Sequence, residues 1–154
     1  MLTNPLTAMA DRLRDRRRSD EGFTLIELLV VVVILGILIG IAIPVYLNYR
    51  KSANDKAAQS DLRNAISTLE VCYSDGGYPT AVNTTTGALT GCTSQGTVKL
   101  SSGTTVKYVG TTASYVMTSQ NSGGTTTRWY CYASTTGGSV TTRTTEISDT
   151  ATAC

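Results

Sequence analysis

Residues 22–45 read GFTLIELLVVVVILGILIGIAIPV, and this stretch constrains how the rest of the chain is arranged. From Leu28 to Val45 it contains 18 consecutive residues without a charged or polar side chain. An α-helix rises about 1.5 Å per residue, so this run extends about 27 Å, close to the roughly 30 Å of a bilayer's hydrocarbon core. The stretch therefore predicts a transmembrane helix.

Two other interpretations of the apolar run are weaker. A buried core helix needs apolar partners on every side, and no other segment of the chain is apolar enough to supply them. A cleaved secretory signal has an apolar region of only about 7–15 residues that ends at an A-x-A-like site. Gly40-Ile41-Ala42, followed by Pro44, matches such a site poorly.

Charge and composition divide the 154 residues into contrasting regions and exclude several functions. The first 22 residues hold five Arg and four acidic residues, whereas Thr, Ser and Gly dominate from about residue 76. The chain has no His, which excludes Ser-His-Asp and Cys-His catalysis, and its net charge of +2 is low for a dedicated nucleic-acid binder. We expect neither an enzyme nor a cofactor, metal or specific nucleic-acid partner.

The distribution of basic residues predicts the orientation of the transmembrane helix. Five Arg precede the apolar run, and only Arg50 and Lys51 follow it closely. Because cytoplasmic flanks carry the excess of Lys and Arg, the N-terminus is predicted to be cytoplasmic and the C-terminal region exported.

The four cysteines all lie in the exported region, where an oxidising compartment favours disulfides. Of three possible connectivities we favour Cys131–Cys154, which ties the C-terminal tail to a strand, and Cys72–Cys92, which fixes a loop to a helix end. Each closes a loop of about 20 residues, worth roughly 3 kcal/mol in the loop-entropy model. A Cys₄ zinc site is the competing interpretation, but the spacing lacks a C-x₂-C pair.

Beyond Pro44 the sequence predicts an amphipathic helix that ends at Asp75-Gly76-Gly77. Its apolar face comprises Ala58, Leu62, Ala65, Ile66, Leu69 and Cys72. Its polar face comprises Asp55, Lys56, Gln59, Arg63 and Glu70.

The C-terminal region predicts a loop over residues 78–96 and then a small antiparallel sheet. The strand candidates are residues 97–100, 104–109, 114–119 and 128–133, with a further one over 140–145. Alternation places Tyr130 and Tyr132 on one face and Trp129, Cys131 and Ala133 on the other. We interpret the aromatic residues as packing rather than as a ligand platform. The predicted fold class is α+β, with the sheet packed on the amphipathic helix.

The segment EGFTLIELLV, from Glu21 to Val30, resembles the processing site of a type IV prepilin. The shared features are a glycine, an aromatic residue and Thr-Leu-Ile-Glu at the start of a long apolar helix. The resemblance extends over about residues 16–75. It implies cleavage by a prepilin peptidase between Gly22 and Phe23, followed by N-methylation of Phe23. The implied segments are a leader (1–22), a membrane and fibre-core helix (23–50), an amphipathic helix (51–75) and a head (76–154).

Glu27 is the unusual residue of the apolar segment, because a carboxylate at mid-membrane depth costs roughly 2.5–3.5 kcal/mol. By the resemblance, it neutralises the new amine of Phe23, in its own subunit or in a neighbouring one, and sets the axial register of a fibre. The alternative is that Glu27 only complements the helix dipole. Gly36, Gly40 and Pro44 form a weak stretch of helix, where we expect a kink and, partly by the resemblance, local melting during fibre packing.

The resemblance implies a structural subunit, first a single-pass protein of the cytoplasmic membrane and then a component of an extracellular filament. The implied partners are other copies of the chain, the prepilin peptidase, membrane lipid and the pilus assembly machinery, with adhesion and twitching motility among the family's roles. Two alternatives remain: a type II secretion pseudopilin or minor pilin, and a membrane-anchored protein whose head binds a surface ligand.

Overall fold

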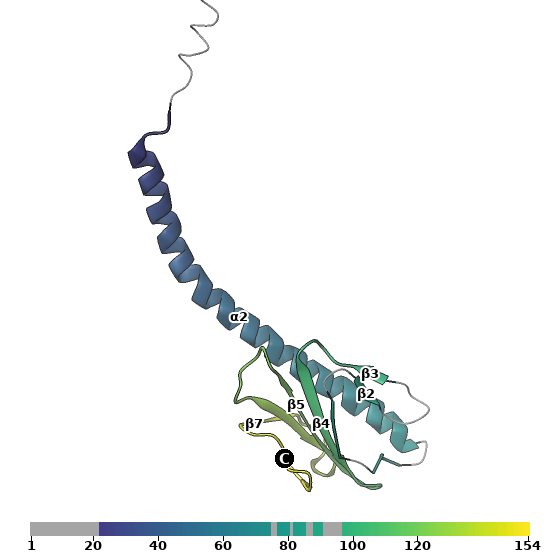
Figure 1. The fold of residues 1–154 in the computed structure, drawn as a ribbon. Coiled ribbons are helices and arrows are strands. Elements are labelled where there is room, and N and C mark those ends of the chain that lie inside the picture. Colours follow the sequence, from purple (N-terminus) through teal and green to yellow (C-terminus); the bar gives the residue numbers. More distant parts are fainter. Residues whose placement is uncertain (1–21, 75–76, 81, 86–87, 91–96) are drawn as a thin grey trace, which may run out of the picture. The chain divides into compact units, whose positions relative to one another are not determined.

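A computed structural model of the chain describes residues 22–74, 77–80, 82–85, 88–90 and 97–154. The chain divides into two compact units, one ending at Pro44 and the other beginning at Val45. One helix, α2 (Leu25–Ser74), is followed by a set of short strands (Figure 1). These are β1 (Val82–Thr85), β2 (Ala88–Thr90), β3 (Thr97–Lys99), β4 (Thr104–Gly110), β5 (Tyr115–Asn121), β6 (Trp129–Ala133) and β7 (Thr141–Arg143), with a 3₁₀ turn η1 (Ser134–Thr136) before β7.

Among the described residues of its own unit, the apolar half of α2 has no partner. Every large apolar side chain from Phe23 to Val45 is about half exposed or more, with values from 48% to 83%. By length and composition α2 contains a segment that can cross a membrane, as the sequence predicted.

The C-terminal end of α2 is set by a glycine. Gly77 has a φ of +100°, a conformation that residues with a Cβ rarely adopt, and its N–H donates to the Tyr73 carbonyl at 3.3 Å. The helix thus ends at Ser74, directly before the predicted stop, of which Asp75 and Gly76 lie outside the described residues.

The strands form the predicted antiparallel sheet, so the α+β fold class is confirmed. Five strands pair in the order β1-β4-β5-β6-β7, and β2 and β3 form a separate pair. The predicted loop over residues 78–96 is partly wrong, because β1 and β2 lie within it. These strands have only four and three residues, and each depends on a partner, β4 or β3, that local sequence does not reveal.

The sheet packs against the second half of α2 through one of its faces (Figure 1). The helix contributes Ala58, Leu62, Ala65 and Leu69, and the sheet contributes Val106, Tyr108, Tyr115, Met117, Tyr130 and Tyr132. Burial of each large apolar side chain stabilises the fold by about 1.5–3 kcal/mol. The predicted apolar face of the helix is therefore confirmed for these four positions.

The opposite face of the sheet is covered by the C-terminal segment. Cys131 and Ala133 lie in a second buried cluster with Val109, Val116 and Ile147. The two faces of β6 thus separate Tyr130 and Tyr132 from Cys131 and Ala133, as alternation predicted.

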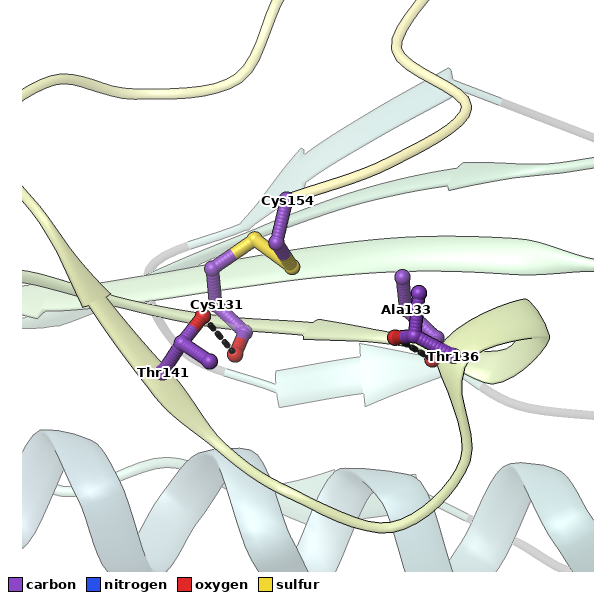
Figure 2. The surroundings of a disulfide bond; sticks show 5 residues. All are labelled: Cys131, Ala133, Thr136, Thr141 and Cys154. Carbon is purple, nitrogen blue, oxygen red and sulfur yellow. Dashed lines mark hydrogen bonds between the residues drawn. A yellow bond between two sulfur atoms is a disulfide. The ribbon is translucent and has the colours of Figure 1, made fainter.

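A disulfide and an ion-pair cluster hold the C-terminal segment in place. The structure joins Cys131 to Cys154, with their Cα atoms 5.8 Å apart, which is the pairing that we favoured (Figure 2). Lys107 Nζ lies 2.7 Å from Asp149 Oδ1 and 3.9 Å from Glu146 Oε2. The Cys72–Cys92 pairing falls outside the described residues, because Cys92 is not among them.

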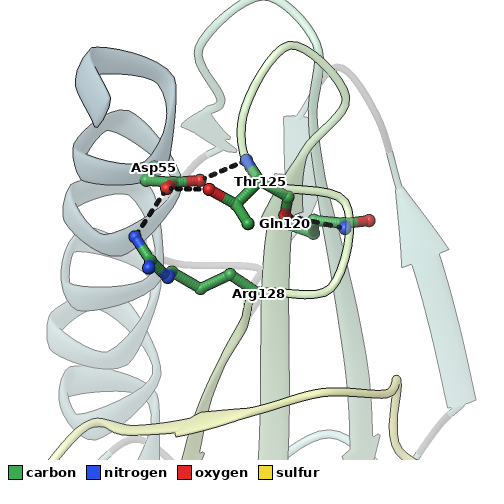
Figure 3. Close-up of polar contacts among 4 residues, drawn as sticks. All are labelled: Asp55, Gln120, Thr125 and Arg128. Carbon is green, nitrogen blue, oxygen red and sulfur yellow. Dashed lines mark hydrogen bonds and ion pairs between the residues drawn. The ribbon is translucent and has the colours of Figure 1, made fainter. Parts of the chain in front are cut away.

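Asp55 was predicted on the solvated face of the helix, and this is wrong. Its residue is only 4% exposed, and its carboxylate accepts hydrogen bonds from Thr125 N and Oγ1 and from Arg128 Nη1, each at 2.8 Å (Figure 3). Gly124 permits this approach, since a Cβ there would lie 2.3 Å from Asp55 Oδ1. The β5–β6 loop folds over the helix at this position, and the helical pattern alone contains no sign of that loop.

Asp61 has an equivalent role at a second connection, the segment between β3 and β4. It is also 4% exposed, and it accepts hydrogen bonds from Ser101 N at 2.8 Å and Ser101 Oγ at 3.1 Å. Hydrogen bonds to a charged group contribute about 1.5–3 kcal/mol each. The two aspartates therefore fix the segment before β4 and the β5–β6 loop to the helix.

A cluster of tyrosines fills the space between the end of the helix and the sheet. The ring of Tyr78 lies 4.8 Å from that of Tyr73 and 4.7 Å from that of Tyr115. The Glu70 carboxylate accepts hydrogen bonds from the hydroxyls of Tyr78, at 2.9 Å, and Tyr115, at 2.7 Å. Tyr108 stacks on Tyr115 and donates to the Pro79 carbonyl at 2.6 Å.

Burial and the Glu70 carboxylate raise the pKa of Tyr78 to about 12 and raise that of Tyr115 further, while burial raises the pKa of Tyr108 to about 12. The pKa of Lys107 is also raised, chiefly by its hydrogen bond to Asp149. All four groups hold their protons more tightly in the folded chain than in the unfolded one.

We predict that the head unfolds more easily as the pH rises above about 10. There the unfolded tyrosines ionise while the folded ones stay protonated up to about 12, so the free energy of unfolding falls across this range. Denaturant midpoints measured against pH, with tyrosinate absorbance as a second readout, check this. Tyr78→Phe, which removes one such group, should flatten the decline; a free energy of unfolding independent of pH in this range contradicts the account.

Candidate functional site

The candidate site is the beginning of α2, where Thr24 caps the helix. Thr24 Oγ1 accepts a hydrogen bond from Glu27 N at 3.3 Å, and Thr24 N donates to Glu27 Oε2 at 2.8 Å. The Thr24 hydroxyl also donates to the same carboxylate oxygen at 2.7 Å. This reciprocal pair is a capping box, which satisfies backbone N–H groups that the first turn of a helix leaves without partners.

The capping box fixes where the Glu27 carboxylate lies. Both donors from Thr24 reach Oε2, and among the residues that the structure describes no group donates to Oε1. The carboxylate is thus held over the helix N-terminus, where the helix dipole favours a negative charge, with one oxygen open. Glu27 therefore has a local role in the helix and a free acceptor for a cation.

Gly22 and Phe23 lie immediately before this cap and are exposed, Phe23 by 80%. A Cβ built on Gly22 would meet nothing within 4 Å. Contacts with the described residues therefore do not require glycine at this position.

Gly36, Gly40 and Pro44 all lie inside the continuous helix α2. A Cβ on either glycine would meet nothing within 4 Å, so packing against the described residues does not explain these glycines. Pro44 has no N–H to donate to the carbonyl of Gly40, which removes one hydrogen bond of the helix ladder. The three residues of the weak stretch therefore lie within the helix, and local melting of this stretch remains a prediction.

The sequence contains a local pattern that predicts this cap. Thr24-Leu-Ile-Glu27 fits the S/T-x-x-E pattern of a capping box before an apolar run. The structure thus brings two pairs of residues together. Glu27 lies beside Thr24 at the helix start, and Cys131 is bonded to Cys154 in the head. Among the described residues there is no group of three or more His, Cys, Asp or Glu side chains that could hold a metal.

Comparison with known proteins places this site in a described motif. Residues 17–43 match the prokaryotic N-terminal methylation motif. The chain is 45% identical over 56 residues to the type IV major fimbrial protein FimA of Dichelobacter nodosus, covering 36% of each chain. It is 43% identical over 58 residues to the type IV wide pilus major component PilA4 of Thermus thermophilus, covering 38% of this chain and 44% of that one.

A secretion protein is also similar. The type II secretion system core protein G of Klebsiella michiganensis is 38% identical over 66 residues, or 42% of this chain and 46% of that protein. The chain thus spans between about a third and just under half of the length of these curated relatives, and no solved structure matches it significantly. The matches confirm the predicted resemblance to type IV pilins.

We predict that Thr24→Ala frays the first turn of α2. The change removes the hydroxyl that accepts from Glu27 N and donates to Glu27 Oε2, and loss of such a cap costs about 1 kcal/mol. Hydrogen exchange of the full chain in detergent micelles should show about fivefold lower protection for the amides of Glu27 and Leu28, which donate to Thr24. Thr24→Ser keeps the hydroxyl and should exchange like the unaltered chain; equal protection in Thr24→Ala contradicts the capping role.

Proposed function

We propose that this chain is a prepilin, and that its mature form, beginning at Phe23, is the structural subunit of a type IV pilus. One observation carries the proposal: a methylation motif over residues 17–43 includes the start of a helix whose apolar half has no partner among the described residues of its own unit. Such a surface needs lipid or other apolar helices around it. A prepilin meets that need twice, first in the membrane and then in the core of a filament.

The proposed cleavage hydrolyses the peptide bond between Gly22 and Phe23. The products are the leader, residues 1–22, ending in a carboxylate, and a mature chain whose Phe23 amine is protonated and then N-methylated. Both groups of the scissile bond lie in the exposed segment before the cap. The leader with its five Arg stays in the cytoplasm, the helix crosses the cytoplasmic membrane, and the head is exported.

Glu27 is proposed to pair with the Phe23 ammonium that cleavage creates. Two opposite charges attract strongly where the surrounding dielectric is low, and either charge left alone there is costly. Thr24 occupies only Oε2, so Oε1 remains available to an ammonium of the same chain or of a neighbour. Pairing with a neighbour gives each incoming subunit a defined axial position.

Filament growth follows from the remaining surfaces. Transfer of the helices from lipid into a bundle of copies keeps their apolar side chains out of water, and head-to-tail contacts that do not close produce a fibre. We propose that the segment from Gly36 to Pro44 melts locally as the helices pack. The partners are therefore other copies, the prepilin peptidase, the assembly machinery and membrane lipid, and the role is structural rather than catalytic.

A pseudopilin of a type II secretion system, or a minor pilin, is the second candidate. It is favoured by the similarity to core protein G, which covers 42% of this chain. The two candidates share the helix and its processing. They differ in the abundance of the chain in surface fibres. A major pilin accounts for most of the protein in surface fibres, whereas a pseudopilin or minor pilin does not.

Glu27→Gln tests the assembly role, because it removes the charge and keeps the size of the side chain. We expect normal export and cleavage, with the yield of sheared fibres reduced about tenfold or more, since the loss of a charged partner in an apolar core exceeds about 1.4 kcal/mol. Lys56→Gln, which removes an exposed charge in the second half of α2, is the control and should assemble normally. Normal fibre yield from Glu27→Gln would refute the pairing.

A further inference from the structure

A polar groove crosses the head at the free edge of the sheet. It has a volume of about 500 Å³ and lies between the β5–β6 loop and the segment that begins with β7. Two arginines, Arg128 and Arg143, and five threonines line it, and no apolar residue does. Its volume falls within the range of small-molecule sites, but its lining selects a polar ligand.

The charge of the groove is positive. Arg128 is held by the buried Asp55, to which its Nη1 donates at 2.8 Å, so this guanidinium has a fixed place at one wall (Figure 3). Arg143 has neither an ion pair nor a side-chain hydrogen bond with any described residue. Glu146 and Asp149, the nearest acids in sequence, instead point their carboxylates at Lys107.

Hydroxyl groups supply the rest of the lining. Thr125 donates to Asp55, but the hydroxyls of Thr142, Thr144 and Thr145 make no hydrogen bond to another described residue, and these three threonines are exposed. A ligand that offers several hydroxyls together with one carboxylate matches this set. The guanidinium fork binds a planar carboxylate through two parallel hydrogen bonds, and threonine hydroxyls both donate to and accept from sugar hydroxyls.

We propose that this groove binds an acidic sugar, with the sugar carboxylate on Arg143 and the sugar hydroxyls on the β7-side threonines. A nucleic acid fits the groove less well, because its affinity comes from many phosphate contacts, whereas the groove offers one arginine without a partner among the described residues. The proposal concerns the head alone and does not depend on processing or fibre assembly.

The chain contains its own reporter for binding. Trp129 is the only tryptophan; it follows Arg128 directly and lies opposite Arg143 in the β6–β7 register. Its ring is partly exposed, so a ligand in the groove changes its surroundings. Tryptophan fluorescence of the unlabelled chain therefore measures occupancy next to the two arginines.

The test titrates the full chain in detergent micelles with a trimer of galacturonic acid, followed by Trp129 fluorescence and by calorimetry on the same samples. We expect saturable binding of the acidic trimer. The neutral galactose trimer should bind at least about tenfold more weakly, because it lacks the carboxylate that pairs with the guanidinium. Arg143→Gln should weaken binding of the acidic trimer by a similar factor. Arg63→Gln removes an exposed arginine of α2 and is the matched control, expected to bind normally.

Several results would overturn the proposal. These are the absence of both a heat and a fluorescence change, equal binding of the neutral and acidic trimers, and unchanged binding by Arg143→Gln. Binding of inorganic phosphate or of a short single-stranded DNA as tight as that of the acidic trimer would assign the groove to another anion. Failure to form fibres, in a chain that still binds the trimer, would count against the proposed function alone.

Discussion

The apolar surface of the first half of α2 is the constraint on which the rest of the molecule depends. Its Leu, Ile and Val side chains are about half exposed or more, and the first unit contains nothing among its described residues to cover them. Exposed apolar surface in water costs about 25 cal/mol per Å², so a helix of this length is not tolerated in solution. Under the proposed function, a bilayer covers this surface first and the helices of other copies cover it in the fibre.

The second half of the same helix has the opposite character, because it supports a folded head. Ala58, Leu62, Ala65 and Leu69 bury one face under the sheet. Asp55 and Asp61 then fix two connections of the sheet to the helix through hydrogen bonds that buried carboxylates require. Apolar burial gives this unit its stability, and the two aspartates give it a single register of helix against sheet.

The sequence was sufficient wherever a pattern is local. The apolar run, the helical spacing from Ala58 to Leu69 and the alternation along β6 each predicted what the structure contains. It was insufficient where a partner distant in sequence decides the outcome: β1 depends on β4, and Asp55 on a loop about 70 residues away. The Thr24–Glu27 cap differs from both groups. Its pattern is local, but a carboxylate in an apolar segment also predicts a charged partner, and the structure shows the local partner, Thr24.

The cap and the proposed ion pair are compatible roles for one carboxylate. Thr24 uses one oxygen and leaves the other open, so the helix start is ordered before any neighbour arrives. A preordered carboxylate lowers the entropic cost of pairing during assembly. Under the proposed function, the motif connects the cleavage that creates the Phe23 ammonium to the packing in which Glu27 neutralises it.

The central claim is that the chain loses residues 1–22 and becomes the main subunit of a fibre. Mass spectrometry of filaments sheared from the cell surface tests it most directly. We expect the dominant protein to begin with N-methylated Phe23, with no peptide from the leader. Filaments in which the chain still carries its leader, or from which a Phe23-initiated chain is absent, would contradict the claim.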